Sequence, residues 1–488
     1  MKSSWTRILL LTAIAAFAAS PALQAAEYWG TEELLRQAEA NRRIHVGNVP
    51  VLPSELGERG AIDYMERFAM VAEFLTTLQV SNDTLPNFGG MMEGEFQTNI
   101  IQTDNTAEAI WIWSHYTDLT GDTTYLGNIA AAWSYVMNHP AYNEEGGSGE
   151  LGYYRVYNSA WAMASEMEYR RVFGDSTYIW YSDSTAHYVL NNPLNLYGPP
   201  PYDILNGMVT GWAAGNLYAY GESVGDTLFR SEAAAIGGLV KGWAEGNPAA
   251  RLGGWNWAMS GGAAFWGVAN SYFRRYPEGL RSWSEAYDDY LQNYVTEGNY
   301  QNAWNLWFAL GHYTAWDTQG DLQRKENHQR IVDFLIGLDA DGDGGIGQND
   351  GSPNYNDQSW VTSYLGYVGL DKLLGVVDLV LIPDTTTVLP GDALSFTSVV
   401  VNNTGRTLPA DGWADVYMPD GTPFPRNPVL GPFSFNLPGF GSASLTFTQP
   451  IPLSTSPGTY GYRGSVGTWP DTVEDSDDAL IEVTAGEP

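Results

Sequence analysis

The stretch AEAIWIWSHYTDLT, residues 107–120, is followed at once by Gly121-Asp122, and this combination recurs along the chain. Each recurrence joins an aromatic-rich, apolar run, typical of a buried helix, to a short polar turn. Glycine reaches the left-handed backbone region that closes a helix, and we expect the aspartate to cap the next helix. Further Gly-Asp pairs stand at 174–175, 225–226 and 320–321, with Pro-Glu at 277–278 in the corresponding place, at intervals of 43 to 53 residues.

A second kind of helix is expected between these runs. Tyr64, Phe68, Val71, Leu75 and Leu78 follow the three- and four-residue spacing of an outer helix with one buried face. The segment FLTTLQ at 74–79 also reappears as FLIGLD at 334–339. The repeating unit is therefore outer helix, loop, inner helix and tight turn. About six such units predict a mainly α fold, an (α/α)6 toroid over residues 26–376, with an open helical solenoid as the alternative.

The loops of this repeat differ strongly in length. The turns after the inner helices are short, whereas the connections that lead into them are long. In a ring all the long connections lie at one end, which we call the mouth, and long loops on a rigid scaffold are where function is expected. The long connections cover residues 80–105, 139–158, 191–207, 247–262 and 339–360.

The first residues follow the pattern of a secretory signal peptide. Lys2 and Arg7 precede an apolar run over 8–19 and small residues up to Ala26, so we predict a signal peptide over 1–25. The protein is accordingly expected outside the cell, at its surface or in the periplasm. No later segment has about twenty uninterrupted apolar residues, so we expect no membrane span. The sequence leaves the oligomeric state open.

The composition restricts the partners. The chain has 56 acidic and 23 basic residues and a formal net charge of −33, which disfavours nucleic acid and anionic membranes. It has no cysteine, so disulfides are excluded. Its 19 Trp, 30 Tyr and 17 Phe are far too many for a disordered chain.

Residues 377–488 have a different pattern, with short alternating strands separated by Pro, Gly, Asp and Asn. This predicts an immunoglobulin-like β-sandwich. The stretch PGTYGYRGSVG at 457–467, followed by DSD at 475–477, resembles the C-terminal modules of secreted bacterial proteins. That resemblance implies an accessory role in stability or surface attachment. We expect strands at 376–383, 393–403, 413–419, 443–450, 458–467 and 479–484.

Gly-Gly loops precede several inner helices, as NFGG at 87–90, EEGG at 144–147, LGGW at 252–255 and DGGI at 343–346. With this repeat, residues 32–375 resemble the α/α toroids shared by six-hairpin glycosidases and by terpenoid cyclases and prenyltransferases. A resemblance to the protein prenyltransferases implies a zinc site with a cysteine ligand, and one to the terpenoid cyclases implies an Asp-x-Asp-Asp acid motif. The chain has no cysteine, and Gly342 stands where the last aspartate would follow Asp341. These departures favour the glycosidase side.

A glycosidase needs two carboxyl groups that flank the cleft, one acting as acid and the other as base or nucleophile. We predict Asp104 and Asp203 as the catalytic pair, with Glu93 third. Asp104 directly precedes an inner helix, although Asp104-Asn105-Thr106 is equally a good N-cap sequence. The candidate acids of the mouth are Glu93, Glu95, Asp104, Glu108, Glu144, Glu145, Glu150, Asp203 and Asp357.

The mouth also contains aromatic side chains suited to stacking on sugar faces and an arginine suited to holding a carboxylate or hydroxyls. We interpret the protein as a secreted glycoside hydrolase acting on a neutral or acidic glycan. A non-catalytic glycan-binding or cell-surface protein on a prenyltransferase-like toroid scaffold is the alternative, and a structural extracellular module is a third hypothesis. A polysaccharide lyase with a tyrosine or histidine base is less favoured. The predicted substrate-binding residues are Tyr154, Arg155, Tyr157, Tyr202, Trp255, Trp257 and Trp360.

The most specific short motif is DADGDGGIGQND at 339–350. Its spacing is that of an EF-hand loop, which places several oxygens around one Ca²⁺ ion. We predict a structural Ca²⁺ site that fixes the last mouth connection; a glycine-rich turn with solvated acids is the alternative. The predicted ligands are Asp339, Asp341, Asp343, the carbonyl of Gly345, and Asp350.

Overall fold

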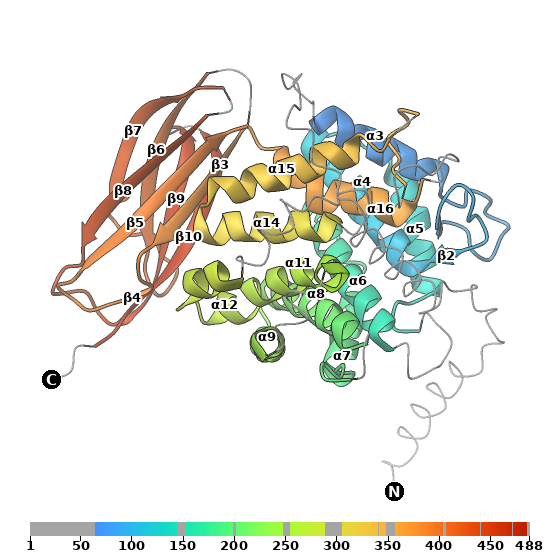
Figure 1. Ribbon diagram of the computed structural model, residues 1–488, viewed down its shortest axis with the longest axis horizontal. Coiled ribbons are helices and arrows are strands. Elements are labelled where there is room, and N and C mark those ends of the chain that lie inside the picture. Colours follow the sequence, from blue (N-terminus) through green and yellow to red (C-terminus); the bar gives the residue numbers. More distant parts are fainter. Residues whose placement is uncertain are drawn as a thin grey trace, which may run out of the picture.

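The structure is a computed structural model in which helices and strands form separate parts (Figure 1). The expected signal peptide lies outside the described residues, and no side chains are described for 202–204, 254–260 and 305. Among the described helices none is long and apolar enough to cross a membrane. The described residues are 64–143, 152–198, 202–246, 254–287, 305–339, 341–347, 357–403, 407–439, 441–470 and 472–485.

The helices alternate between an inner and an outer set. The outer set comprises α3 (Tyr64–Thr77), α5 (Leu126–Asn138), α7 (Ile179–Asn191), α9 (Thr227–Gly246) and α15 (Leu322–Ile336). A single helical turn, α12 (Tyr272–Arg275), follows α11, and residues 280–287 after it are helical in the outer position. The inner set comprises α4 (Thr103–Thr120), α6 (Gly152–Phe173), α8 (Tyr202–Ser223), α11 (Gly254–Ala269), α14 (Asn305–Gln319) and α16 (Ser359–Tyr364), which continues through η2 (Leu365–Gly369) and η3 (Leu370–Leu373).

The inner helices close into a ring. Each packs against the next from α4 to α14, α14 packs against η2, and α16 returns to α4. This closure supports a toroid over an open solenoid. The count of six hairpins stays a prediction, because residues 288–304, between α12 and α14, lie outside the described residues.

The repeat pattern of the sequence has a direct structural counterpart. Phe68, Val71 and Leu75 of α3 are buried, as expected for the inward face of an outer helix. Gly121 and Gly174 have φ values of 71° and 64°, the left-handed conformation that closes an inner helix. The tight turns therefore form as the glycine positions predict.

The prediction that each turn aspartate caps the next helix is correct only in part. The side chain of Asp321 accepts the N–H of Gln323 and caps α15, and Asp226 accepts the N–H of Leu228 at the start of α9. Asp122 and Asp175 instead each bond the threonine two residues later, within the turn. At these two turns the following helix begins several residues beyond the aspartate, so the cap prediction is wrong there.

The centre of the ring is filled by aromatic side chains. Trp161 of α6, Trp212 of α8 and Trp307 of α14 are fully buried. The ring centroids of Trp161 and Trp212 are 4.9 Å apart, and those of Trp212 and Trp307 are 5.6 Å apart. Tyr364 and Tyr367 complete this group from the last inner segment. These aromatic side chains pack against one another at the centre of the ring.

The C-terminal strands form two sheets that share an apolar core. One sheet has the order β4-β10-β9-β6-β7 and the other β3-β5-β8. The carboxylates of Asp475 and Asp477 accept the backbone N–H groups of Leu379 and Leu381 on β3, so the DSD segment ties the two sheets together. The strands are β3 (Val377–Pro383), β4 (Thr387–Val388), β5 (Ala393–Asn402), β6 (Leu408–Tyr417), β7 (Leu430–Leu437), β8 (Ser442–Pro450), β9 (Gly458–Thr468) and β10 (Thr472–Val483).

The sandwich contacts the toroid at the tight-turn end of the inner helices. Trp316, near the end of α14, packs with Val380, Ile382 and Val399 in one apolar cluster. Gly320 lies against the same surface, since a Cβ there would come within 2.3 Å of Ile382. The sandwich therefore contacts the end of α14 that lies away from its mouth end, and Figure 1 shows it there beside α14 and α15.

Candidate active site

The first and last mouth connections are joined by backbone hydrogen bonds. The first contains a short ribbon of β1 (Met91–Met92) and β2 (Ile101–Gln102). Glu93 follows β1; its N–H donates to the carbonyl of Ile100, and its carbonyl accepts the N–H of Ser359 at 3.0 Å. These bonds fix the backbone of Glu93 at the start of α16.

The side chain of Glu93 is buried, with 4% of the residue exposed. Its Oε2 accepts a hydrogen bond from Nδ2 of Asn105 at 2.9 Å, and the indole N–H of Trp360 donates a second. Burial outweighs these bonds and, helped by the nearby charge of Asp104, raises the pKa of Glu93 to about 8. Glu93 is therefore largely protonated at neutral pH.

Asp104 lies in the first turn of α4 and is 3% exposed. Its Oδ1 accepts the backbone N–H of Asn105 at 2.9 Å, and the hydroxyl of Tyr154 donates a further hydrogen bond. Burial nevertheless raises its pKa to about 6. The N-cap of α4 is Gln102, so the alternative interpretation of Asp104 as the cap residue is wrong.

Glu108 lies one helical turn after Asp104 on the same helix. It is 1% exposed, and neither of its carboxyl oxygens has a hydrogen-bond partner among the described residues. Burial, with smaller contributions from the charges of Asp104 and Glu93, raises its pKa well above the usual value. Glu93, Asp104 and Glu108 thus form one buried group, which we call the mouth carboxyl cluster.

The other predicted residues divide into two sets. Tyr154 bonds Asp104, Tyr157 lies close enough to Glu108 and Asp104 for their charges to act on it, and Trp360 bonds Glu93. Arg155 lies between the two tyrosines on α6 and is half-buried. Tyr202 and Asp203 at the start of α8, and Trp255 and Trp257 at the start of α11, have side chains outside the described ones, so their roles stay predictions.

Sequence reasoning placed Glu108 among the mouth acids without choosing it, and it gave Asn105 no role at the site. The signal for Glu108 is its four-residue spacing from Asp104, which places both on one face of α4. The amide of Asn105 joins this face to Glu93, a contact that local spacing does not reveal.

The predicted calcium loop brings its first three carboxylates together. One oxygen from each of Asp339, Asp341 and Asp343 lies within 4.8 Å of the other two. Gly342 and Gly344 have φ values of 80° and 96° and allow the sharp bend. Asp350 lies outside the described residues.

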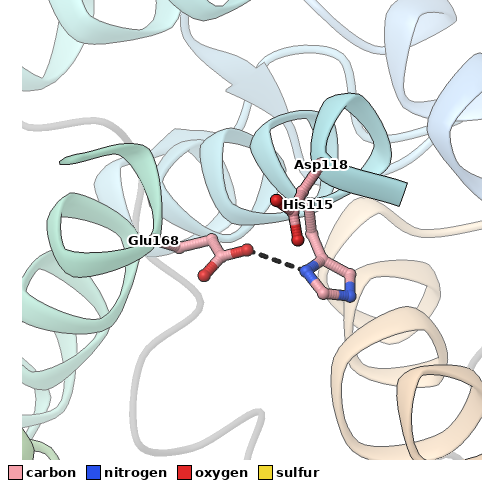
Figure 2. A group of neighbouring side chains, drawn as sticks. All are labelled: His115, Asp118 and Glu168. Atoms are coloured by element: carbon pink, nitrogen blue, oxygen red, sulfur yellow. Dashed lines mark hydrogen bonds and ion pairs between the residues drawn. The ribbon is translucent and has the colours of Figure 1, made fainter. Parts of the chain in front are cut away.

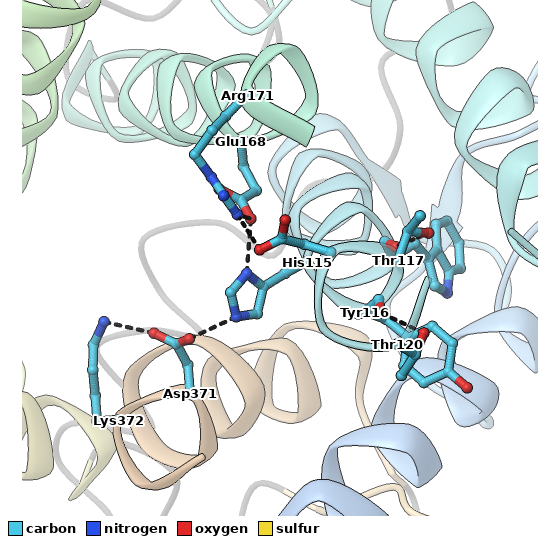
Figure 3. Close-up of polar contacts among 10 residues, drawn as sticks. His115, Tyr116, Thr117, Thr120, Glu168, Arg171, Asp371 and Lys372 are labelled. Atoms are coloured by element: carbon cyan, nitrogen blue, oxygen red, sulfur yellow. Dashed lines mark hydrogen bonds and ion pairs between the residues drawn. The ribbon is translucent and has the colours of Figure 1, made fainter. Parts of the chain in front are cut away.

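A second charged group lies at the opposite end of the ring. The imidazole of His115 on α4 lies between two carboxylates, with Nδ1 at 2.7 Å from Glu168 and Nε2 at 2.8 Å from Asp371 (Figures 2 and 3). Arg171 pairs with Glu168, and Lys372 pairs with Asp371. Figure 2 also shows Asp118 beside His115, an arrangement that resembles a set of metal ligands.

The partners of His115 argue for an ion-pair network rather than a metal site. Against the effect of burial, the two carboxylates raise the pKa of His115 to about 9. The ring is therefore protonated, and both nitrogens are already engaged, so no lone pair faces a metal. A cavity of about 450 Å³ adjoins the network and is lined by Trp111, Glu168, Arg171, Asn216, Trp266 and Tyr367.

No protein-family description and no characterised protein sequence matches this chain. Among solved structures, the chain is similar to an α-1,6-mannanase, GH76A of Salegentibacter sp. HEL1_6. An inactive variant of that enzyme in complex with α-1,6-mannotriose has 14% identity and a TM-score of 0.46, covering 64% of this chain and all of that one. A second structure of the same mannanase has 12% identity and a TM-score of 0.45, covering 64% and 98%.

The chain is also similar to the CARDB domain of a Pyrococcus furiosus protein, solved in complex with di-metal ions, at 19% identity and a TM-score of 0.17. This match covers 22% of this chain and 86% of that one.

Proposed function

We propose that the protein is a glycoside hydrolase in which Glu93 is the general acid and Asp104 is the ionised carboxylate. The observation that carries this proposal is the hydrogen-bonded arrangement of the two groups at the mouth. Both side chains are buried, both lie beside Asn105, and each has its own donor from another inner segment, Trp360 for Glu93 and Tyr154 for Asp104. Such support holds two carboxyl groups in fixed positions, as glycoside hydrolysis requires.

The protonation states agree with these roles. The pKa of Glu93 is about 8 and that of Asp104 about 6, so near pH 7 the first holds a proton and the second is charged. Two carboxyl groups whose surroundings separate their pKa values are typical of an acid and base pair. Burial raises the pKa of Glu108 and so favours its neutral form, which limits repulsion of the charge on Asp104.

The proposed reaction follows from the protonation states of Glu93 and Asp104. The proton of Glu93 passes to the glycosidic oxygen as the bond from that oxygen to the anomeric carbon breaks, and the leaving sugar departs as an alcohol. Asp104 either attacks the anomeric carbon and is later released by water, or removes a proton from the water that attacks. In the first course Glu93 regains its proton from the water that releases the sugar from Asp104. In the second course Asp104 ends with the proton of the attacking water, and proton exchange with solvent restores both groups. Each course consumes one water molecule per bond.

The sugar-binding part of the proposal rests on the aromatic side chains beside the cluster. Tyr154 hydrogen-bonds Asp104, Trp360 hydrogen-bonds Glu93, and Tyr157 lies near Asp104. We propose that these aromatic side chains contact the sugar. Burial raises the pKa of Tyr157 well above its usual value, so its hydroxyl stays protonated. A tyrosine base is therefore disfavoured, and with it the lyase alternative. We also propose that the enzyme acts after export, on the basis of Lys2, Arg7 and the apolar run that follows.

A screen of neutral and acidic polysaccharides for release of reducing ends, with absorbance to detect lyase products, tests the proposal. We expect hydrolysis of at least one glycan by the wild type, and a loss of about 10²- to 10⁴-fold in Asp104→Asn and in Glu93→Gln. Asp183→Asn, on the exposed surface of α7, is the matched control and should retain activity. Glycan binding without cleavage by the wild type would contradict the proposal and favour the non-catalytic alternative.

A further inference from the structure

We propose that Asp357 completes a calcium site with Asp339, Asp341 and Asp343, and that the bound ion fixes the backbone that carries Glu93 and Trp360. The binding part of this inference is independent of the proposed function, whereas the effect on activity rests on it. The set differs from the one that the EF-hand spacing predicts, because Asp357 supplies a carboxylate from beyond the loop.

Asp357 is the observation that points to a ligand. It is 4% exposed, and its carboxylate accepts no hydrogen bond and forms no ion pair with the residues that the structure describes. The charges that act on it are those of Asp343, Glu95, Asp341 and Asp339, all negative. A buried carboxyl group that faces only like charges either takes up a proton or is neutralised by a cation, and one cation among Asp339, Asp341, Asp343 and Asp357 would relieve the repulsion of all four at once.

The loop holds its carboxylates toward the same place. Asp339 accepts the N–H groups of Gly342 at 2.7 Å and Gly344 at 3.1 Å, so its side chain is folded over the loop. A Cβ at Gly344 would lie 2.5 Å from the backbone of Met70, which shows that the bend is pressed against α3. A Cβ at Gly345 would lie 2.8 Å from Cβ of Asp357, so Asp357 adjoins the loop directly.

The chemistry of these side chains selects the cation. Four carboxylates from two segments offer only oxygen, and the described surroundings include no histidine beside them. Hard oxygen ligands in an irregular arrangement suit Ca²⁺, which accepts six to eight of them, better than Mg²⁺, which requires a near-octahedral set. Among the described residues, Arg67 is the one basic side chain that pairs with these four aspartates, through Asp339. A single positive charge leaves the four carboxylates strongly negative as a group.

Backbone hydrogen bonds connect this site to the mouth carboxyl cluster. The carbonyl of Ile346 accepts the N–H of Gln358 at 3.1 Å, and Gly347 pairs with Asp357. Gln358 pairs in turn with Gly94, directly after Glu93. Trp360, which donates to Glu93, follows Asp357 by three residues. An ion bound to Asp357 would therefore restrict the position of both Glu93 and its donor.

Glu95 orients Asp357 from the other side. Its backbone N–H donates to the carbonyl of Asp357 at 3.2 Å, and its carboxylate accepts the N–H of Asp357 at 3.4 Å. These bonds orient the backbone that carries Asp357. We therefore assign Glu95 a positioning role and not that of a ligand.

Calorimetric titration of the EGTA-treated full chain with CaCl₂, combined with thermal unfolding, tests the inference. We expect one saturable site, a melting temperature that rises with Ca²⁺ concentration, and a weaker response to MgCl₂. Asp341→Asn and Asp357→Asn should each weaken binding at least tenfold, and circular dichroism should show that both fold, whereas Asp183→Asn should bind as the wild type does. Unchanged affinity in Asp357→Asn would overturn its place in the ligand set, and absence of binding by the wild type would overturn the site.

The link to Glu93 has its own readout. Removal of Ca²⁺ should lower the hydrolytic rate of the wild type, and added Ca²⁺ should restore it. If Ca²⁺ binds but no glycan is cleaved, the proposed function fails and the site stands. If a glycan is cleaved equally with EGTA and with Ca²⁺, the function stands and the link to Glu93 fails.

Discussion

The side-chain amide of Asn105 donates a hydrogen bond from Nδ2 to Oε2 of Glu93 at 2.9 Å, while its backbone N–H donates to Asp104. One residue of α4 therefore bonds both candidate catalytic carboxyl groups. Because Glu93 belongs to a mouth connection and Asp104 to a helix, Asn105 sets the position of one group relative to the other.

The pH profile of activity should be bell-shaped. Hydrolysis requires Asp104 ionised, so kcat/KM should rise as the pH passes about 6, and it requires Glu93 protonated, so kcat/KM should fall as the pH passes about 8. The two apparent pKa values belong to the pair, because the groups interact. Initial rates between pH 4 and 10 measure the profile. Glu93→Gln should abolish the fall above pH 8, and a profile that keeps this fall would contradict the assignment.

Asn105→Ala should move the alkaline limb of that profile to higher pH. Burial raises the pKa of Glu93, and the hydrogen bond from Asn105 partly offsets that rise. Loss of this bond should therefore raise the pKa of Glu93 further. We expect a reduced maximal rate as well, because Glu93 loses a positioning contact. Thr124→Ala, in an exposed turn, is the control and should leave the profile unchanged. An alkaline limb that moves to lower pH in Asn105→Ala would count against the role of this bond.

His115→Gln should destabilise the fold by about 3 kcal/mol near pH 6, because it leaves Glu168 and Asp371 without the cation between them. His115 has a pKa of about 9 in the folded protein against 6.5 for the free side chain. Its contribution is therefore complete below pH 6.5 and disappears as the pH rises toward 9. Denaturant unfolding at several pH values measures the difference, and exposed His187→Gln should show almost none. A wild-type advantage that grows above pH 8 would refute the network.

Gly121→Ala and Gly320→Ala form a matched pair. Both glycines have nearly the same left-handed φ, 71° and 67°, but a Cβ at Gly121 meets nothing within 4 Å, whereas one at Gly320 would lie 2.3 Å from Ile382. We expect about 1 kcal/mol of destabilisation from strain at Gly121 and about 2–4 kcal/mol at Gly320, where overpacking against β3 is added. Equal losses in thermal or denaturant unfolding would mean that the sandwich does not pack on this turn as described.

The periodic part of the fold could be predicted from the sequence because the signals are local. Gly121 and Gly174 close helices through their own backbone, and the stripe from Phe68 to Leu75 identifies a buried face without reference to the rest of the chain. Strand β7 was missed because it lies at the edge of its sheet, is mostly exposed, and contains Gly431 and Pro432 near its start. Buried and exposed residues do not alternate regularly along β7, so the sequence pattern does not indicate a strand there.

The candidate site could be predicted only in part. Asp104 and Glu93 were expected at the mouth, and the structure brings both into one buried group with Tyr154 and Trp360. The pairing of Asp357 with the calcium loop and the bridge from Asn105 to Glu93 depend on which connections meet in space. Residue spacing contains no information on such contacts, which arise when the ring closes.

The central claim is that Glu93 gives its proton to the leaving group, and a matched pair of substrates tests it most directly. The sugar found in the screen should be presented both as its natural glycoside and as a dinitrophenyl glycoside, whose leaving group departs without protonation. For Glu93→Gln we expect kcat/KM to fall about 10²- to 10⁴-fold on the natural glycoside and by less than about tenfold on the dinitrophenyl glycoside. An equal loss on both substrates, or no loss on either, would contradict the assignment.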